Sequence, residues 1–196
     1  MKYEVTDFTK VIAGDIGFTL THGPGRYTIP LGQLFIGDQS AWEHVKLGLN
    51  GNIDAPIGMF GEARPPKARI AAVQQDEDTL WYRLPLTDEQ RARIDAEARR
   101  DMRAGDIKYA WLAFLNMGLL KLGVRPEFIK NQVESGKAKI CSQYVDHYLT
   151  NAGMDVLQGV FPGEVSPGDL SFRFANDPSI KPFRIDGKDP WTRPTR

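Results

Sequence analysis

The chain has 196 residues, which suits one domain of good size and would be cramped for two. Its 41% hydrophobic and 26% charged residues are typical of a globular protein with a core of its own. Lysine plus arginine and aspartate plus glutamate each number 25, so the formal net charge is zero. Because no basic excess is available to neutralise phosphates, we expect no nucleic-acid partner.

The N-terminal segment and the longest apolar run bear on where the protein is made. Residues 1–18 contain no uninterrupted apolar stretch and no small-residue cleavage site, so we expect no secretory signal and synthesis in the cytoplasm. The apolar run at 109–120 is too short to span a bilayer and predicts a buried helix over 106–122. The single cysteine cannot form a disulfide within the chain.

The first half of the chain predicts strands. Val45, Leu47 and Leu49 alternate with other residues, as in a half-buried strand. Glycine, proline and asparagine separate this segment from its neighbours and predict turns. The expected strands are 14–21, 44–52, 57–64, 68–74 and 80–86, with a short helix at 30–38. Short strands at this close spacing favour an antiparallel meander or small barrel.

From Thr87 on, the pattern changes to helices. Thr87, followed three residues later by Gln90, predicts a capping box in front of a charged helix, which Gly105 ends. The buried helix at 106–122 follows, and then a helix that begins at Cys141. The expected fold class is therefore α+β, with a sheet packed against helices.

The last part of the chain contains one more expected strand, LSFRFA at 170–175, and a proline-rich tail. The tail shows little hydrophobic periodicity, so no regular element is expected in it. We expect residues 1–175 to form the domain and residues 176–196 to form an arm. This arm would wrap the domain or dock on a protein partner, and the alternative is that it is disordered.

Cys141 stands at the first turn of an amphipathic helix. The residues at helical spacing that we expect to face the core are Tyr144, Val145, Tyr148, Leu149 and Ala152. A thiol at a helix N-terminus feels the positive end of the helix dipole and nearby backbone N–H groups, which stabilise thiolate. Cys141 can therefore be a nucleophile. The alternative is a buried structural cysteine that behaves as a small apolar residue.

A nucleophilic cysteine needs a base, and the chain has three histidines. His147 follows Cys141 by six residues, which places it about 240° around the same helix and out of reach. His22 lies in a turn-rich segment, whereas His44 begins a predicted strand. No spacing typical of a zinc site is present, so we expect neither a metal nor another cofactor.

Six short motifs occur in a characteristic order. They are AGDIGF, EHVKLGL, MFGEA, YAWLAFLNMGLL, CSQYVDHYLTNAG and SPGDL, from about residue 13 to residue 171. In this order and spacing the chain resembles the circularly permuted branch of the NlpC-type papain-like hydrolases, the YiiX-like proteins. The resemblance implies a permuted papain-like fold in which the histidine-bearing strands precede the cysteine helix.

The resemblance also implies roles for individual residues. Cys141 would be the nucleophile, His44 the general base and Glu62 the residue that orients the imidazole. Asp54, in the turn before MFGEA, competes with Glu62 for the third role. Tyr109 and Ser142 would line the substrate pocket. The chain departs from the family at Glu43, where a small hydroxyl residue often precedes the histidine.

The function implied is a cysteine peptidase or amidase that works through an acyl-enzyme. Its expected substrates are peptidoglycan stem peptides of the cell wall, with lipid-acyl amides or thioesters as the other class. A virion-borne enzyme in a phage particle would be compatible with the absence of a signal peptide. The alternative is a catalytically silent subunit of a larger assembly, which keeps the fold and docks through its C-terminal arm.

Overall fold

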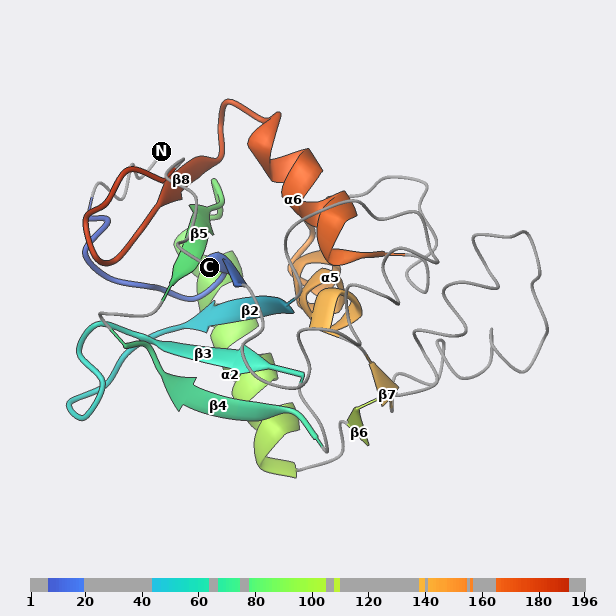
Figure 1. Cartoon of the computed structure of the whole chain (residues 1–196). Helices are drawn as coiled ribbons and strands as arrows, with labels where there is room; N and C mark the ends of the chain where they lie inside the picture. Colours follow the sequence, from blue (N-terminus) through green and yellow to red (C-terminus); the bar gives the residue numbers. More distant parts are fainter. Residues whose placement is uncertain are drawn as a thin grey trace, which may run out of the picture.

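A six-stranded antiparallel sheet forms the centre of the fold (Figure 1). The computed structural model describes residues 7–19, 44–63, 67–74, 78–104, 108–109, 138–139, 141–154, 156 and 165–190. The strands are β1 (Ile16–Thr19), β2 (His44–Leu49), β3 (Met59–Glu62), β4 (Arg69–Ala72), β5 (Thr79–Arg83) and β8 (Lys181–Phe183). Their order across the sheet is β4-β3-β2-β1-β5-β8. All five strands predicted from the first half of the chain are confirmed.

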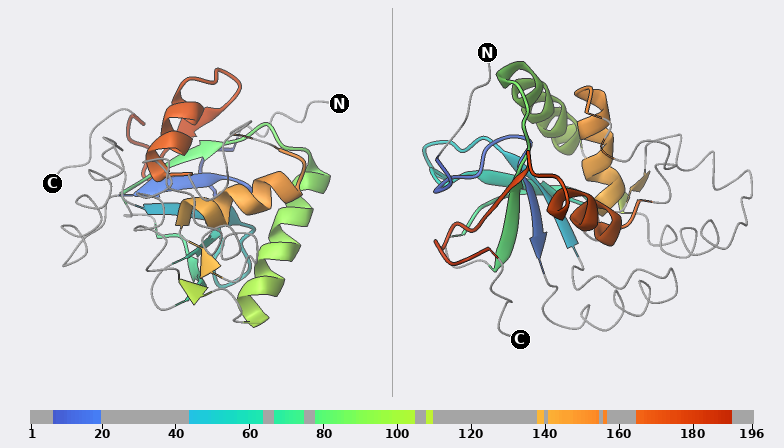
Figure 2. Two further views of the ribbon diagram at one scale, coloured as in Figure 1. Left: turned by 90° about the vertical axis from the view of Figure 1, so that its right-hand side faces the viewer. Right: turned by 90° about the horizontal axis from the view of Figure 1, so that it is seen from above.

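Three helices in the described part of the chain cover one face of this sheet (Figure 2). They are α2 (Asp88–Ala104), α5 (Cys141–Asn151) and α6 (Pro167–Ala175). Their apolar side chains share one hydrophobic cluster with alternate residues of the central strands, such as Val45, Leu47 and Leu49. The opposite face carries a smaller cluster around Phe60 and Trp81. The fold is therefore α+β, as predicted.

Helix α2 begins where the sequence predicts. The backbone N–H of Gln90 donates to the Thr87 hydroxyl at 3.2 Å, and the Thr87 N–H donates to the Gln90 side chain at 2.9 Å. This reciprocal pair satisfies two N–H groups that the first helical turn leaves without partners. The last residue of the helix is Ala104, directly before Gly105.

The segment LSFRFA is a helix, so the strand predicted at 170–175 is wrong. Ser166 caps α6, and its hydroxyl accepts from the backbone N–H of Asp169. Leu170 and Phe174, one helical turn apart, are buried, whereas Phe172 between them is exposed. The alternation of Leu170, Phe172 and Phe174 therefore does not reflect a strand. The cap at Ser166 favours a helix instead.

One further expectation meets the structure only in part, and another is not tested. The helix predicted over 106–122 does not begin at 106, because Lys108–Tyr109 forms a short strand, β6, that pairs in parallel with β7 (Ala138–Lys139). The remainder of that segment and the helix predicted at 30–38 lie outside the described residues. Among the described helices, none is both long enough and apolar enough to span a membrane.

The start of the proline-rich tail belongs to the sheet. β8, within the segment expected to form an arm, pairs antiparallel with β5 and places Phe183 opposite Trp81. Phe183 is buried in the smaller hydrophobic cluster. This part of the tail therefore completes one edge of the domain.

A buried carboxylate ties the N-terminal segment to the sheet. Asp15, in the motif AGDIGF, is fully buried. Nε and Nη2 of Arg83 donate to its two carboxylate oxygens at 3.1 and 2.8 Å, and the backbone N–H of Ile12 donates at 3.0 Å. Buried charges of this kind are tolerated only when paired and hydrogen-bonded. The network holds β1 beside β5 and fixes the start of the sheet.

Candidate active site

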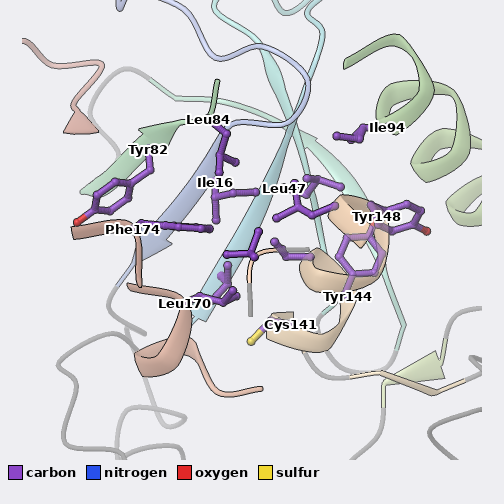
Figure 3. Packing of buried hydrophobic residues seen from close by; sticks show 14 of the residues in the cluster. Ile16, Leu47, Tyr82, Leu84, Ile94, Cys141, Tyr144, Tyr148, Leu170 and Phe174 are labelled. Atoms are coloured by element: carbon purple, nitrogen blue, oxygen red, sulfur yellow. The ribbon is translucent and has the colours of Figure 1, made fainter. Parts of the chain in front are cut away.

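Cys141 begins α5 and is buried together with the apolar face of that helix. All five residues predicted to face the core, Tyr144, Val145, Tyr148, Leu149 and Ala152, are buried. In Figure 3 the sulfur of Cys141 points away from the rings of Tyr144 and Tyr148. Cys141 belongs to the main hydrophobic cluster and is 1% exposed.

His44 is the first residue of β2, the strand against which α5 packs. It is buried, with 9% of its surface exposed. The pairing of Leu47 with Gly61 places Glu62 one position further along β3, on the same face as His44. Gly61 itself leaves room for the helices, because a Cβ there would lie 2.9 Å from the hydroxyl of Tyr144.

Glu62 is in direct contact with the histidine. Oε2 of Glu62 lies 2.6 Å from Nε2 of His44, and the carboxylate is 1% exposed. Its other oxygen, Oε1, accepts from Nε of Arg69 at 2.6 Å and lies 2.6 Å from Nη2 of the same guanidinium. One carboxylate oxygen therefore contacts His44 on β2, and the other contacts Arg69 on β4.

The use of Nε2 by Glu62 determines which nitrogen of His44 is available to the thiol. A hydrogen bond and the charge of Cys141 both act on the imidazole. Because Nε2 is turned toward the carboxylate, Nδ1 is the ring nitrogen left to share a proton with the sulfur. Cys141, His44 and Glu62 thus form a continuous chain of contacts across α5, β2 and β3.

The electrostatics of this chain favour a charged pair. Burial alone would raise the pKa of Cys141, but the charge of His44 and hydrogen bonds with His44 and the backbone of Val45 and Ser142 lower it. Burial alone would lower the pKa of His44, yet Cys141 and Glu62 raise it to about 9. A thiolate and an imidazolium at these two positions therefore stabilise each other.

Glu62 stays ionised although it is buried. Burial would raise its pKa, but the hydrogen bond and charge of His44, followed by those of Arg69, lower it to about 2. An ionised carboxylate accepts a hydrogen bond from Nε2–H and stabilises the positive charge of the ring. Glu62 is thus suited to hold His44 in one orientation and one tautomer.

Asp54, the alternative third residue, does not reach His44. It lies exposed in the turn between β2 and β3, where its backbone N–H donates to the side chain of Asn52. The structure brings Glu62 and not Asp54 to the imidazole. His147 is also elsewhere, at 3.3 Å from the side-chain amide of Asn151 on the outer part of α5.

The two residues predicted to line a pocket have different positions. The hydroxyl of Ser142 is buried and donates to the backbone carbonyl of Val165 at 2.6 Å. Tyr109 lies in β6, where its backbone pairs with that of Lys139, two residues before Cys141. Its side chain, His22 and Glu43 lie outside the described residues. A pocket role for Ser142 and Tyr109 stays a prediction.

Arg69 is the member of this group that the sequence analysis did not identify. It lies on β4, directly opposite Glu62 on β3. The signal for it was the register of two predicted strands, 57–64 and 68–74, which are joined by a short turn. Side chains opposite each other in an antiparallel pair lie on one face, but the exact register is not evident from the alternation alone.

No protein-family model and no curated protein matches the chain. Within the described residues, no three histidine, cysteine, aspartate or glutamate side chains gather as a metal site would require.

Proposed function

We propose that this protein is a cysteine hydrolase with a permuted papain-like fold, which cleaves an amide through an acyl-enzyme. The single observation that carries the proposal is the contact chain from Cys141 through His44 to Glu62. A structural cysteine needs neither a buried histidine as partner nor a carboxylate behind that histidine. A nucleophilic cysteine needs both.

Each residue has a defined part in this reaction. The Cys141 thiolate attacks the substrate carbonyl carbon, and a C–S bond forms. Nδ1–H of His44 then gives its proton to the leaving amine as the C–N bond breaks, which leaves a thioester. A water molecule attacks the thioester while His44 takes a proton from the water. The C–S bond then breaks, which releases the acid and regenerates the Cys141 thiolate beside the His44 imidazolium.

The helix N-terminus supplies a second element of catalysis. The first N–H groups of an α-helix have no partner within the helix, and their partial positive charge favours an anion. The backbone N–H of Cys141 would therefore donate to the oxyanion that forms on the substrate carbonyl. Glu62 takes no proton in this scheme; it keeps His44 oriented and its positive charge stabilised.

The family resemblance makes peptidoglycan stem peptides the first substrates to test. Lipid-acyl amides and thioesters are the second class, since the same acyl-enzyme chemistry would cleave them. The resemblance is also the reason for proposing a permuted papain-like fold, because the cysteine helix follows the histidine strand in the chain.

The test is the state of Cys141 as a function of pH. Thiolate absorbance in the ultraviolet, taken as the difference between the parent and Cys141→Ser, needs no access for a reagent to the buried sulfur. The rate of alkylation by iodoacetamide is measured alongside. We expect a thiolate that is already present at about pH 6, well below the pKa of about 8.5 of a free thiol.

The matched controls are two histidine variants. His44→Ala should return thiolate formation to the pH range of a free thiol, whereas His147→Ala, on the same helix as Cys141 but outside the contact chain, should leave it unchanged. Thiolate formation that begins only at about pH 8.5 in the parent, and is indifferent to His44, would exclude the proposed hydrolase.

A further inference from the structure

We infer that Arg69 is a positioning residue of the proposed site, which fixes the Glu62 carboxylate so that one oxygen is always presented to His44. This inference rests on the proposed function and extends the contact chain by one strand, to β4. The supporting observations are the division of the carboxylate oxygens, the pairing of the strands and the difference in exposure between the two partners.

The division of the oxygens is the first observation. Both Nε and Nη2 of Arg69 lie 2.6 Å from Oε1 of Glu62, while Oε2 lies 2.6 Å from Nε2 of His44. A carboxylate can rotate about its last side-chain bond, which has only a broad torsional preference. A rigid guanidinium fork on one oxygen removes this freedom. Oε2 is then held in place for the imidazole before any substrate binds.

The strand pairing makes this contact a built-in feature of the sheet. Glu62 and Arg69 are direct partners in the antiparallel register of β3 and β4. Directly opposite side chains have Cβ atoms about 5 Å apart, so a glutamate and an arginine can meet with little freedom of the backbone. The next cation along β2, Lys46, holds its ammonium 4.3 Å above the ring of Phe60.

The difference in exposure indicates a role beyond filling the core. The Glu62 side chain is 1% exposed, whereas the Arg69 side chain is 54% exposed. An exposed arginine contributes little to folding through packing, so its replacement should leave the domain folded. Without the Arg69 guanidinium, the buried Glu62 carboxylate is more easily protonated and more free to rotate. In either case it stabilises the positive charge of His44 less well.

The groups that meet at this point come from four elements. They are Cys141 from α5, His44 from β2, Glu62 from β3 and Arg69 from β4. The imidazolium and the guanidinium stand opposite the thiolate and the carboxylate, and the buried Lys46 of β2 lies near the same carboxylate, directly opposite it in the strand register. Loss of the guanidinium removes one positive charge beside the buried carboxylate, which shifts the acid limb of thiolate formation to higher pH.

The experiment compares Arg69→Gln, Arg69→Lys and Glu62→Gln with the parent, with thiolate absorbance of Cys141 against pH as the readout. We expect the acid midpoint to move upward in Arg69→Gln, whereas Glu62→Gln reports separately how the carboxylate itself affects the midpoint. Every pH unit of this movement lowers the thiolate population on the acid limb about tenfold. Arg69→Lys should recover part of the loss, because it restores the charge but not the fork.

Arg93→Gln is the matched control. Arg93 is also more than half exposed and also pairs with a glutamate, Glu97, but it lies on α2 away from the contact chain. Its profile should equal that of the parent, and thermal unfolding checks that each variant is folded. A merely structural role of Arg69 would lower thermal stability without moving the midpoint.

The outcomes separate this inference from the proposed function. If Glu62→Gln moves the midpoint and Arg69→Gln does not, the role of Arg69 is wrong and the hydrolase proposal stands. If neither variant nor His44→Ala changes thiolate formation, both proposals are wrong. A shift in Arg69→Gln that Arg69→Lys partly reverses supports the positioning role.

Discussion

Nε2 of His44 and Oε2 of Glu62 lie 2.6 Å apart, although 18 residues separate them in the chain and both are buried. Neighbouring antiparallel strands bring them together on one face of the sheet. This contact orients the imidazole so that its other nitrogen is available to Cys141.

Removal of the thiol should abolish hydrolysis without unfolding the protein. Cys141→Ala is expected to lower kcat/KM at least about 10³-fold on any substrate that the parent cleaves. The double variant Cys141→Ala with His44→Ala should have about the same kcat/KM as Cys141→Ala alone, because the two residues act as a unit. Steady-state kinetics test this, with circular dichroism as the check of folding. Additive losses would contradict a shared role.

Hydrolysis and alkylation should diverge at alkaline pH. The pKa of His44 is raised to about 9, so the imidazolium is present at neutral pH and loses its proton as the pH rises through that value. Hydrolysis requires this proton for the leaving group and should decline above about pH 9. Alkylation requires only thiolate and should not decline. Parallel profiles for the two reactions would contradict His44 as the acid.

Glu62 should contribute to stability in a defined acid range. Its pKa is lowered from 4.5 to about 2, so its stabilising contribution is fully present above pH 4.5 and is lost as the pH falls through about 2. A shift of this size corresponds to a contribution of about 3 kcal/mol to the free energy of unfolding.

The comparison for this third prediction is Glu62→Gln against the parent. Urea unfolding is measured from neutral pH down to the lowest pH at which both remain folded. The parent should lose more unfolding free energy than Glu62→Gln over this range, since other carboxylates contribute equally to both. Equal losses would mean that Glu62 is not ionised in the folded protein.

The Asp15 network should be the strongest electrostatic support of the fold. Asp15→Asn leaves the buried guanidinium of Arg83 without its charged partner, and removal of one member of such a pair costs about 3–5 kcal/mol. Arg93→Gln, which breaks an exposed pair on α2, should cost about 0.5 kcal/mol or less. Urea unfolding of both variants at neutral pH tests the contrast, and similar small losses would contradict it.

The sequence by itself determined the five strands of the first half, the helices α2 and α5, and the cysteine and histidine of the candidate site. The alternation of Val45, Leu47 and Leu49 identified β2, and the spacing of Tyr144, Val145 and Tyr148 identified the buried face of α5. Such patterns are local, because each follows from the geometry of one strand or one helix. His44 and Cys141 could therefore be singled out before their positions in space were known.

Only the tertiary structure decided what lies beside them. Both Glu62 and Asp54 were open as the third residue until the register of β2 and β3 placed Glu62 against His44. Arg69 became visible only through the pairing of β3 with β4. A shift of one residue in a strand pairing moves every side chain of that strand to the other face of the sheet. The alternation of apolar residues within one strand does not determine which residue of the neighbouring strand lies opposite. The sheet, formed by segments far apart in the chain, makes that choice.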